Sequence, residues 1–179
     1  LLFTYGMTTA CAIASGATNC LLAIRVAPSV DNGTSGSFGS RELINRMQLI
    51  LRALDITTTT AGANLLITAV LNGTPSAGAT WVKPATVTSS LAEVADYGGT
   101  VRTISGGETT GGFFLGTGAY SIDLTTVRDL GNSILGGGST TSATGIYPDG
   151  PDTLHIMVRN LGAVSASVFA RLSWTEAQA

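Results

Sequence analysis

Apolar residues alternate with small or polar residues along much of the chain, and a period of two predicts β-strands. One such run extends from Phe3 to Ile13, and a second extends from Cys20 to Val26. Ser15 and Gly16 lie between the two runs, where a two-residue turn would join them. We therefore predict an N-terminal hairpin, followed by a loop, within residues 1–39.

The pattern over residues 42–56 fits two kinds of element. As a strand, this segment places Met47 and Leu51 on one face; as a helix, it forms an apolar stripe that Ser40 would cap. The four threonines at positions 57–60 and the apolar run that follows them favour two strands joined by a turn. We predict a strand.

Shorter elements are predicted between residues 65 and 125. Asn72-Gly73 is a turn signal that ends a strand over residues 65–71. Residues 89–97 are predicted as one short helix, because Ser90 and Glu93 match a capping box. The remaining expected elements are an edge strand over 81–87, a short strand over 101–104 and an alternating strand over 120–124.

The alternation is clearest near the end of the chain. One run places Leu154, Ile156 and Val158 on a single face, and a second run extends from Val168 to Trp174. We predict that these two strands form a hairpin.

Many short strands with turn-rich connections predict an all-β fold, an antiparallel β-sandwich of jelly-roll type with at most one short helix. The length of 179 residues fits one domain, so residues 1–179 are expected to form a single β-sandwich domain. The chain begins with Leu1 rather than Met, and we expect it to be the C-terminal part of a longer or processed polypeptide.

The composition is poor in charge. Charged residues make up 11% of the chain, against about 25% in an ordinary soluble domain. Lys83 is the only lysine. Protein interfaces are depleted in Lys, Glu and Asp, so we expect other subunits to cover much of the exterior. Nine basic residues against eleven acidic ones argue against nucleic-acid binding, and the apolar runs are too short to predict insertion into a membrane.

Cys11 and Cys20 are the only cysteines. In the predicted hairpin they lie opposite each other, and a disulfide between them would need a slight approach of the strands. Two cysteines in a chain of this length are not a disulfide framework, so we interpret both as small buried hydrophobes.

Motifs of enzymes are largely missing from the sequence. His155, the only histidine, lies on the predicted strand face opposite the apolar one, so we interpret it as an exposed or interface side chain rather than a general base. Residues 131–136 resemble a nucleophile elbow, but their second glycine comes one residue too late. Asp149 and Asp152 are interpreted as parts of a turn rather than calcium ligands. We predict no enzymatic activity, no metal and no cofactor.

Six segments carry a resemblance to a known family: SRELINRMQL (40–49), LLITAVLNGTP (65–75), SLAEVADY (90–97), SGGETTGGFF (105–114), residues 124–138 with the core VRDLGNSILGGG (127–138), and residues 152–179. They resemble segments of virion structural proteins of tailed phages, of the marine cyanobacterial myovirus type. The resemblance covers residues 40–179 and implies a β-rich C-terminal domain of a larger tail, baseplate or fibre polypeptide, oligomeric in the virion. The motifs are structural, so the resemblance carries over no catalytic residues.

We therefore predict a phage virion structural protein that acts through subunit assembly and host contact. The expected partners are further copies of the chain in a homotrimer, other virion proteins and a host surface glycan, with assembly in the host cytoplasm. Three alternatives stay open: a capsid decoration protein, a bacterial filament or adhesin subunit with an N-terminal donor strand, and a carbohydrate-binding module built on Trp81 and the tyrosines.

The candidate interface residues are apolar or arginine side chains on faces predicted to point away from the core. Phe113 and Phe114 belong either to a glycine-rich projecting loop or to the core, and the sequence leaves both placements open. The complete set is Phe113, Phe114, Met157, Arg159, Phe169 and Arg171.

Overall fold

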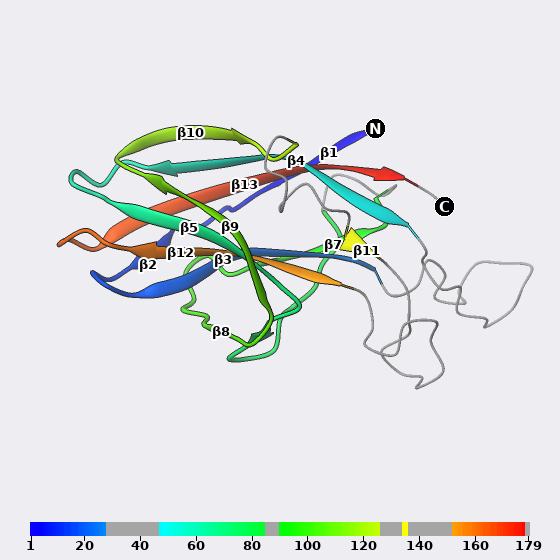
Figure 1. Cartoon of the computed structure of the whole chain (residues 1–179), viewed down its shortest axis with the longest axis horizontal. Coiled ribbons are helices and arrows are strands. Elements are labelled where there is room, and N and C mark those ends of the chain that lie inside the picture. The colour runs from blue at the N-terminus through cyan, green and yellow to red at the C-terminus, as the bar shows by residue number, and fades with distance from the viewer. Residues whose placement is uncertain (28–46, 85–89, 126–133, 136–151, 178–179) are drawn as a thin grey trace, which may run out of the picture.

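The structure is a computed structural model that describes residues 1–27, 47–84, 90–125, 134–135 and 152–177. Within these ranges the chain forms β-strands and no helix. Two antiparallel sheets pack face to face in a sandwich (Figure 1). The predicted all-β antiparallel sandwich is therefore confirmed.

Sheet A has six strands. Its order is β1-β13-β4-β10, with β2 also beside β13 and β11 beside β4. The strands are β1 (Leu2–Gly6), β2 (Cys11–Ile13), β4 (Gln48–Thr58), β10 (Gly118–Asp123), β11 (Ile134–Leu135) and β13 (Ala166–Ala177). Because β1 and β2 pair with successive parts of β13, they act as one interrupted strand along it.

Sheet B has five strands in the order β7-β3-β12-β5-β9. A separate two-stranded ribbon, β6-β8, lies in the connection between β5 and β9. The strands are β3 (Thr18–Val26), β5 (Leu65–Leu71), β6 (Thr74–Pro75), β7 (Ala92–Asp96), β8 (Ile104–Ser105), β9 (Glu108–Leu115) and β12 (Thr153–Asn160).

The strand pairs are nested along the chain. If β1 and β2 count as one strand, the first long strand pairs with the last, β3 with β12, β4 with β10, and β5 with β9. This is one long double ribbon of strands. Its wrapping into two sheets brings β13 beside β4 and β12 beside β5. Eight strands in this arrangement are a jelly roll, the architecture found in viral capsid and lectin domains and in cupins.

The nesting corrects both predicted hairpins. β2 pairs with β13, whereas β3 pairs with β12 and β7, so Ser15-Gly16 turns the chain from one sheet to the other. In the same way β12 and β13 lie in opposite sheets rather than side by side. In a nested arrangement most strands pair with strands that are distant in sequence. The local alternation of apolar and polar residues does not reveal such distant pairing.

The two cysteines consequently face different partners. Cys11 lies opposite Val168 on sheet A, and Cys20 lies opposite Met157 on sheet B. Both are buried and unbridged, so their interpretation as buried thiols is confirmed. Burial raises the pKa of each thiol above its ordinary value.

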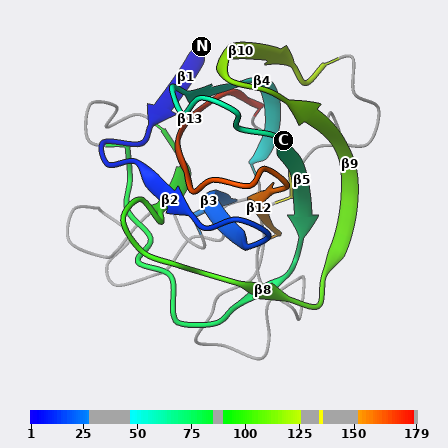
Figure 2. The same cartoon turned by 90° about the vertical axis from the view of Figure 1, so that its left-hand side faces the viewer.

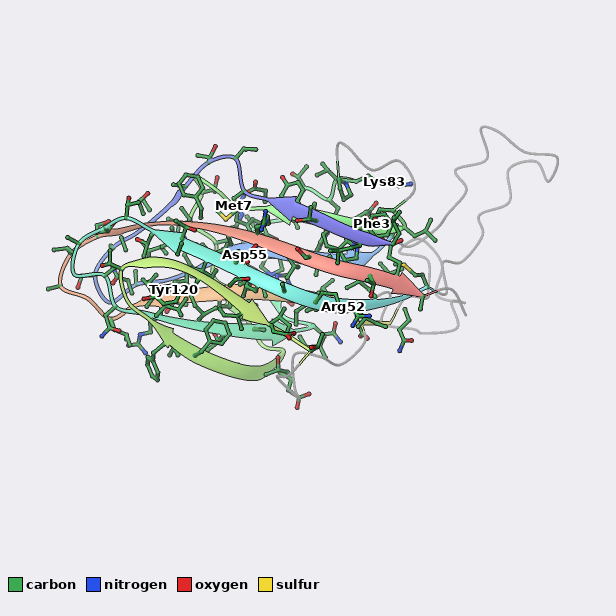
Figure 3. All side chains as sticks on the ribbon, turned by 90° about the horizontal axis from the view of Figure 1, so that it is seen from above. Phe3, Met7, Arg52, Asp55, Lys83 and Tyr120 are labelled. Atoms are coloured by element: carbon green, nitrogen blue, oxygen red, sulfur yellow. The ribbon has the colours of Figure 1, made fainter. Side chains whose placement is uncertain are left out.

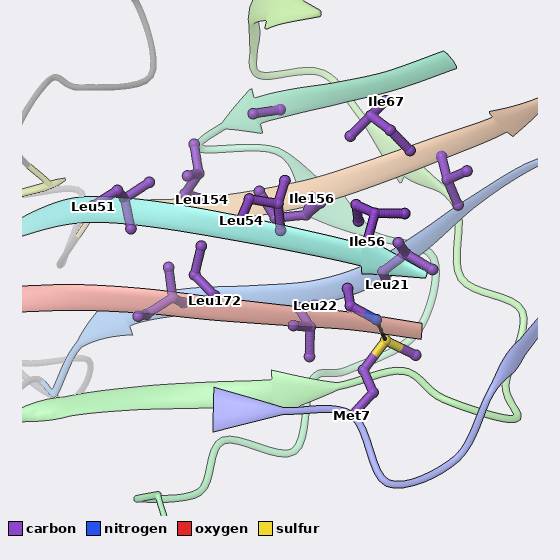
Figure 4. Close-up of a cluster of buried hydrophobic side chains, with 14 of the residues drawn as sticks. Met7, Leu21, Leu22, Leu51, Leu54, Ile56, Ile67, Leu154, Ile156 and Leu172 are labelled. Atoms are coloured by element: carbon purple, nitrogen blue, oxygen red, sulfur yellow. Dashed lines mark hydrogen bonds between the residues drawn. The ribbon is translucent and has the colours of Figure 1, made fainter. Parts of the chain in front are cut away.

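The main core lies between the sheets and is filled by the inward residues of every long strand (Figure 4). Trp174 on β13 is fully buried, and its ring lies 6.1 Å from that of Phe3 on β1. Met7 closes one side of the core, where its Sδ accepts a 3.3 Å hydrogen bond from the backbone N–H of Ala170. These inward residues have the period of two that the sequence predicts.

The strand predicted within residues 42–56 is confirmed over its described part by β4, whereas the predicted helix at 89–97 is wrong. β7 occupies residues 92–96 and pairs with β3. The two capping-box residues find partners elsewhere: Ser90 donates a 2.5 Å hydrogen bond to Glu176, and Glu93 pairs with Arg25 at 2.7 Å. Tertiary partners therefore override a local helix signal.

Two stretches beside β7, residues 73–84 and 97–107, lie over the outer face of sheet B, and we call them the cover (Figure 2). Two strands were predicted in these stretches. Of the strand predicted over 101–104, only Ile104 is in a strand, β8. Of the edge strand predicted over 81–87, the described residues 81–84 contain one isolated bridge, from Val82 to Val94. The cover gives sheet B a second core, formed by Cys20, Ala23, Val70, Ala95, Tyr97 and Met157.

Some features singled out from the sequence lie outside the described residues. These are the loop after residue 27, the residues up to Arg46, the elbow-like glycine motif up to Ser133, the glycine-rich stretch from Gly136, and Asp149. Asp152 is described, and its Oδ1 accepts a 2.8 Å hydrogen bond from Asn72. Asn72 has a positive φ of 55° at the predicted turn.

Candidate functional site

His155 is buried, contrary to the prediction. It does point away from the main core, but its exposed fraction is 1%, because the cover lies over it. Neither ring nitrogen makes a well-formed hydrogen bond. Burial lowers the pKa of the imidazole from its ordinary value, and the backbone of Gly73 in the cover offsets this only in part. Among the described residues, no group of three or more His, Cys, Asp or Glu side chains is arranged to hold a metal ion.

Met157 is also removed from the exposed candidates. It points outward from β12, as predicted, but the cover leaves only 4% of it exposed. Its cross-strand neighbours are Cys20 and Thr68. Met157 therefore belongs to the second core of this chain, and it cannot contact another subunit while the cover is in place.

Beyond the cover, the outer face of sheet B is bare and carries one row of side chains across four strands. Thr18 on β3 lies opposite Arg159 on β12, Arg159 lies opposite Leu66 on β5, and Leu66 lies opposite Phe114 on β9. Phe114 is 70% exposed. Two of the predicted interface residues, Arg159 and Phe114, thus share one row.

The region around Phe113 and Phe114 is a strand rather than a projecting loop. β9 is an edge strand of sheet B, and its alternation sends the two rings to opposite faces. Phe113 is half-buried and packs against the main core, whereas Phe114 faces solvent. Each of the two placements left open by the sequence, core and surface, is therefore correct for one ring.

The outer face of sheet A carries mostly small residues and one ion pair (Figure 3). Arg171 on β13 pairs with Asp55 on β4, and the closest N–O distance is 2.6 Å. Phe169 lies opposite Thr57 on the same face and is 42% exposed. Arg171 and Phe169 therefore project outward together, as their alternation with Leu172 and Val168 predicts.

Two further exposed apolar side chains, which the sequence analysis missed, lie in the connection between β12 and β13. Leu161 is 41% exposed and Val164 is 46% exposed. Asn160 holds this connection in place, because its Nδ2 donates to the carbonyls of Ile13 and Val164 and its Oδ1 accepts from Gly162. The sequence did contain a signal for these two residues, because large aliphatic side chains are unusual in a turn, where polar residues are common.

These exposed side chains gather at one end of the sandwich, the end away from the two termini (Figure 1). Phe114 precedes Leu115, which pairs with Leu65 at the start of β5, and Phe169 lies near the start of β13. We call this end the tip. Its exposed large apolar residues are Phe114, Leu161, Val164 and Phe169, which lie on both outer faces and on the connection between them.

Of the aromatic residues proposed for glycan binding, Tyr147 lies outside the described residues, and the other four are engaged within the chain. The Arg25 guanidinium lies 4.4 Å from the centre of the Trp81 ring, and Arg25 also pairs with Glu93. The Tyr5 hydroxyl donates to Asp96, and the Tyr120 hydroxyl donates to the carbonyl of Thr117. Tyr97 is buried, which raises its pKa to about 12. These rings do not form an open stacking platform.

The N-terminal strand is paired within its own sheet. Residues 2–6 form a complete antiparallel ladder with residues 171–175 of β13. This arrangement differs from the donor strand that the filament or adhesin alternative requires. Within the described residues, the structure also contains no helix long and apolar enough to cross a membrane.

No protein-family model matches the chain, and no curated protein matches it either. The solved structures that give a likeness include two from viruses. A chain in a cryo-EM structure of Broad Bean Stain Virus is 11% identical over 91% of this chain and 90% of that one, with a TM-score of 0.26. The infectious bursal disease virus VP2 subviral particle is 13% identical over all of this chain and 41% of that one, with a TM-score of 0.21. Both TM-scores are low, so neither likeness supports a conclusion about this chain.

Proposed function

We propose that the protein is a structural component of a virion and acts by assembling with copies of itself. The observation that carries the proposal is the tip, where Phe114, Leu161, Val164 and Phe169 are exposed on an exterior that is poor in charge. Exposed apolar patches mark interaction sites on soluble proteins, and these four side chains lie around one end of the sandwich, on its two outer faces and on the connection between them. The jelly-roll architecture is compatible with this role, although a fold does not define a function by itself.

The interface is expected to be centred on aromatic anchors beside arginines. Phe114 shares its row with Arg159, and Phe169 lies on the same face as Arg171. Aromatic residues and Arg are enriched in interfaces, where buried rings supply most of the binding free energy. Phe113 and Met157 are left out of this interface, because both pack within the chain.

The finer assignment follows the resemblance to tailed-phage virion proteins. It places the chain in a tail, baseplate or fibre as a homotrimer, in contact with other virion proteins and a host surface glycan, with assembly in the host cytoplasm. A capsid component is the second candidate, and the nested strand pairs favour it, because jelly rolls are recurrent in viral capsids. A discrete trimer in solution would favour a tail, baseplate or fibre component. Particles seen by negative-stain microscopy would favour a capsid component.

The test compares two charge substitutions at the tip with one on the cover. We expect Phe114→Glu and Phe169→Glu to shift the mass measured by light scattering from an oligomer to the 18.1 kDa monomer, because a carboxylate cannot be desolvated in an apolar contact. Circular dichroism should show that both variants remain folded.

Val101→Glu is the matched control, because Val101 is 67% exposed on the cover. It should leave the oligomer intact. A wild-type chain that is monomeric at micromolar concentration would contradict the proposal, as would equal dissociation by all three variants.

A further inference from the structure

The only histidine of the chain lies buried between sheet B and the cover. Neither ring nitrogen makes a well-formed hydrogen bond, and the polar group that acts on the ring is the backbone of Gly73 in the cover. On sheet B its cross-strand neighbours are Ala23 and Val70, which are apolar. A buried polar group without a hydrogen bond costs free energy, and a buried charge costs much more unless it is paired. The site therefore tolerates a neutral imidazole and disfavours an imidazolium.

The charged and titratable groups around His155 do not supply a counter-charge. On the outer face, β7 offers Glu93, which is already paired with Arg25, and β9 offers Glu108, which is exposed at its end. The other groups on the elements packed here are thiol, phenol or cationic: Cys20 and Arg25 on β3, and Lys83, Tyr97 and Arg102 on the cover. A protonated His155 would thus have the backbone of Gly73 as its polar neighbour and no carboxylate within hydrogen-bond distance.

The cover is attached to sheet B by a small set of hydrogen bonds and one cation–π contact. Val82 exchanges two 2.9 Å backbone hydrogen bonds with Val94 on β7, and the Trp81 ring lies against Arg25. The backbone N–H of Cys20 donates to the carbonyl of Arg102 at 2.8 Å, and the N–H of Arg102 donates to Asn19 at 2.5 Å. The N–H of Tyr97 donates to the carbonyl of Leu21 at 3.1 Å. Two polar atoms in the cover, the Tyr97 hydroxyl and the Arg102 Nε, are themselves buried without partners. Such a segment opens at a lower free energy than the main core.

We propose that His155 is an acid-sensitive latch: when its imidazole takes up a proton from solvent, the cover separates from sheet B while the main sandwich stays folded. Opening lets water reach the imidazolium, which the closed arrangement cannot solvate. It also uncovers the apolar outer face that includes Cys20, Val70 and Met157. This inference concerns the cover alone and does not depend on the proposed assembly at the tip.

The sign of the pH effect follows from linkage. Above about pH 6.5 the imidazole is neutral whether the cover is open or closed, so pH has no effect through this group. Below it, the open state binds the proton first, because burial lowers the pKa in the closed state. One proton bound on opening raises the ratio of open to closed molecules by about tenfold for each pH unit, until the lowered pKa is reached.

The two cysteines provide an internal measurement. Cys20 lies under the cover, whereas Cys11 lies in the main core. Opening of the cover removes the groups that lie over Cys20, whereas Cys11 stays packed in the main core, where its Sγ accepts a 3.0 Å hydrogen bond from Asn19. Global unfolding exposes both. The full chain is treated with a pyridyl disulfide that reacts with thiols from pH 4.5 to 8, and mass spectrometry of peptides gives the modification rate of each cysteine, normalised to a model thiol. We expect the normalised Cys20 rate to rise about tenfold per pH unit below about pH 6.5. It should also stay well above the Cys11 rate at every pH, because Cys11 reacts only in the rarer globally unfolded state.

Variants without the imidazole test whether His155 causes the pH dependence of cover opening. In His155→Leu and in His155→Gln the normalised Cys20 rate should not vary with pH. A Cys20 rate that is flat in the wild type, one that rises as steeply in both variants, or one that never exceeds the Cys11 rate would overturn the proposal. If neither variant folds, NMR titration of the lone imidazole in the wild-type chain serves as the second test. A pKa below 6.5 is expected, and a pKa at or above 6.5 would overturn it.

Discussion

The outer face of sheet B has a covered part and a bare part, although the same strands run through both. On β12, Met157 is under the cover and Arg159, two residues later, is in solvent. On β5, Val70 is covered and Leu66 is half-buried beside the exposed Phe114. The strand pattern determines which way a side chain points. Whether an outward side chain becomes core or surface depends on a separate segment of the chain.

The composition of the two parts agrees with this difference. Apart from His155 and Arg25, the covered part is made of small or apolar residues, which let the cover approach closely. At Gly73 an added Cβ would lie 3.0 Å from the Cγ1 of Val70 on sheet B and 2.2 Å from the Cγ2 of Ile104, which is itself in the cover. The bare part combines Thr18 and Arg159 with one large exposed ring, Phe114. An apolar ring that the chain leaves uncovered beside polar neighbours is the kind of feature that a partner subunit can use.

The largest expected effect separates Met157 from Phe114. Met157→Ala should lower the free energy of unfolding by about 2–5 kcal/mol, because it leaves a cavity in the second core. Phe114→Ala removes a larger side chain, yet it should cost no more than about 0.5 kcal/mol in the monomer, because the ring is in solvent. Urea denaturation of both variants measures the difference. Equal losses would mean that Phe114 is also part of the folded core.

A smaller effect is expected where the cover meets sheet B. Gly73→Ala should destabilise by about 1–3 kcal/mol, because the added methyl group overpacks against Ile104 and Val70. Gly78→Ala, in the same cover, adds its methyl group in open space and serves as the control. Thermal denaturation should show a lower Tm for the first variant only. If both variants match the wild type, the cover is not tightly seated.

The smallest effect compares the two ion pairs. Arg25 and Glu93 are mostly buried, with side-chain exposures of 16% and 19%, and Arg25 also stacks on Trp81. Arg25→Ala should therefore cost about 1–2 kcal/mol. Arg171 is 61% exposed, so Arg171→Ala should cost less than about 1 kcal/mol. Chemical denaturation, with tryptophan fluorescence as the probe, compares them, and a larger loss for Arg171→Ala would contradict this ranking.

The strands were more predictable from the sequence than their partners. The alternation of Leu154, Ile156 and Val158, like that of β4 and β13, follows from burial of one strand face, and this is a local property. Pairing in a nested fold joins residues that are far apart in sequence, such as Leu2 and Thr175. Turn signals such as Ser15-Gly16 suggest a hairpin whether the chain continues into the same sheet or crosses to the other.

The candidate site was predictable only in part. The outward direction of Phe169, Arg159 and Arg171 follows from alternation, and the structure agrees with it. The burial of Met157 and His155 was not predictable, because the cover that buries them has a weak pattern rich in glycine and small residues. Phe113 and Phe114 lie in a glycine-rich strand with a register shift, where composition suggests a loop.

The nested order of strands also has a consequence for the growing polypeptide on the ribosome. β13 lies between β1 and β4, so sheet A remains split until residues 166–177 have been synthesised. Until then the inward faces of strands made much earlier have no complete layer to pack against. Long-range pairing of this kind makes folding slow and leaves unfinished chains prone to aggregation. Nascent chains of this protein are therefore expected to need chaperone protection until translation has passed the last strand.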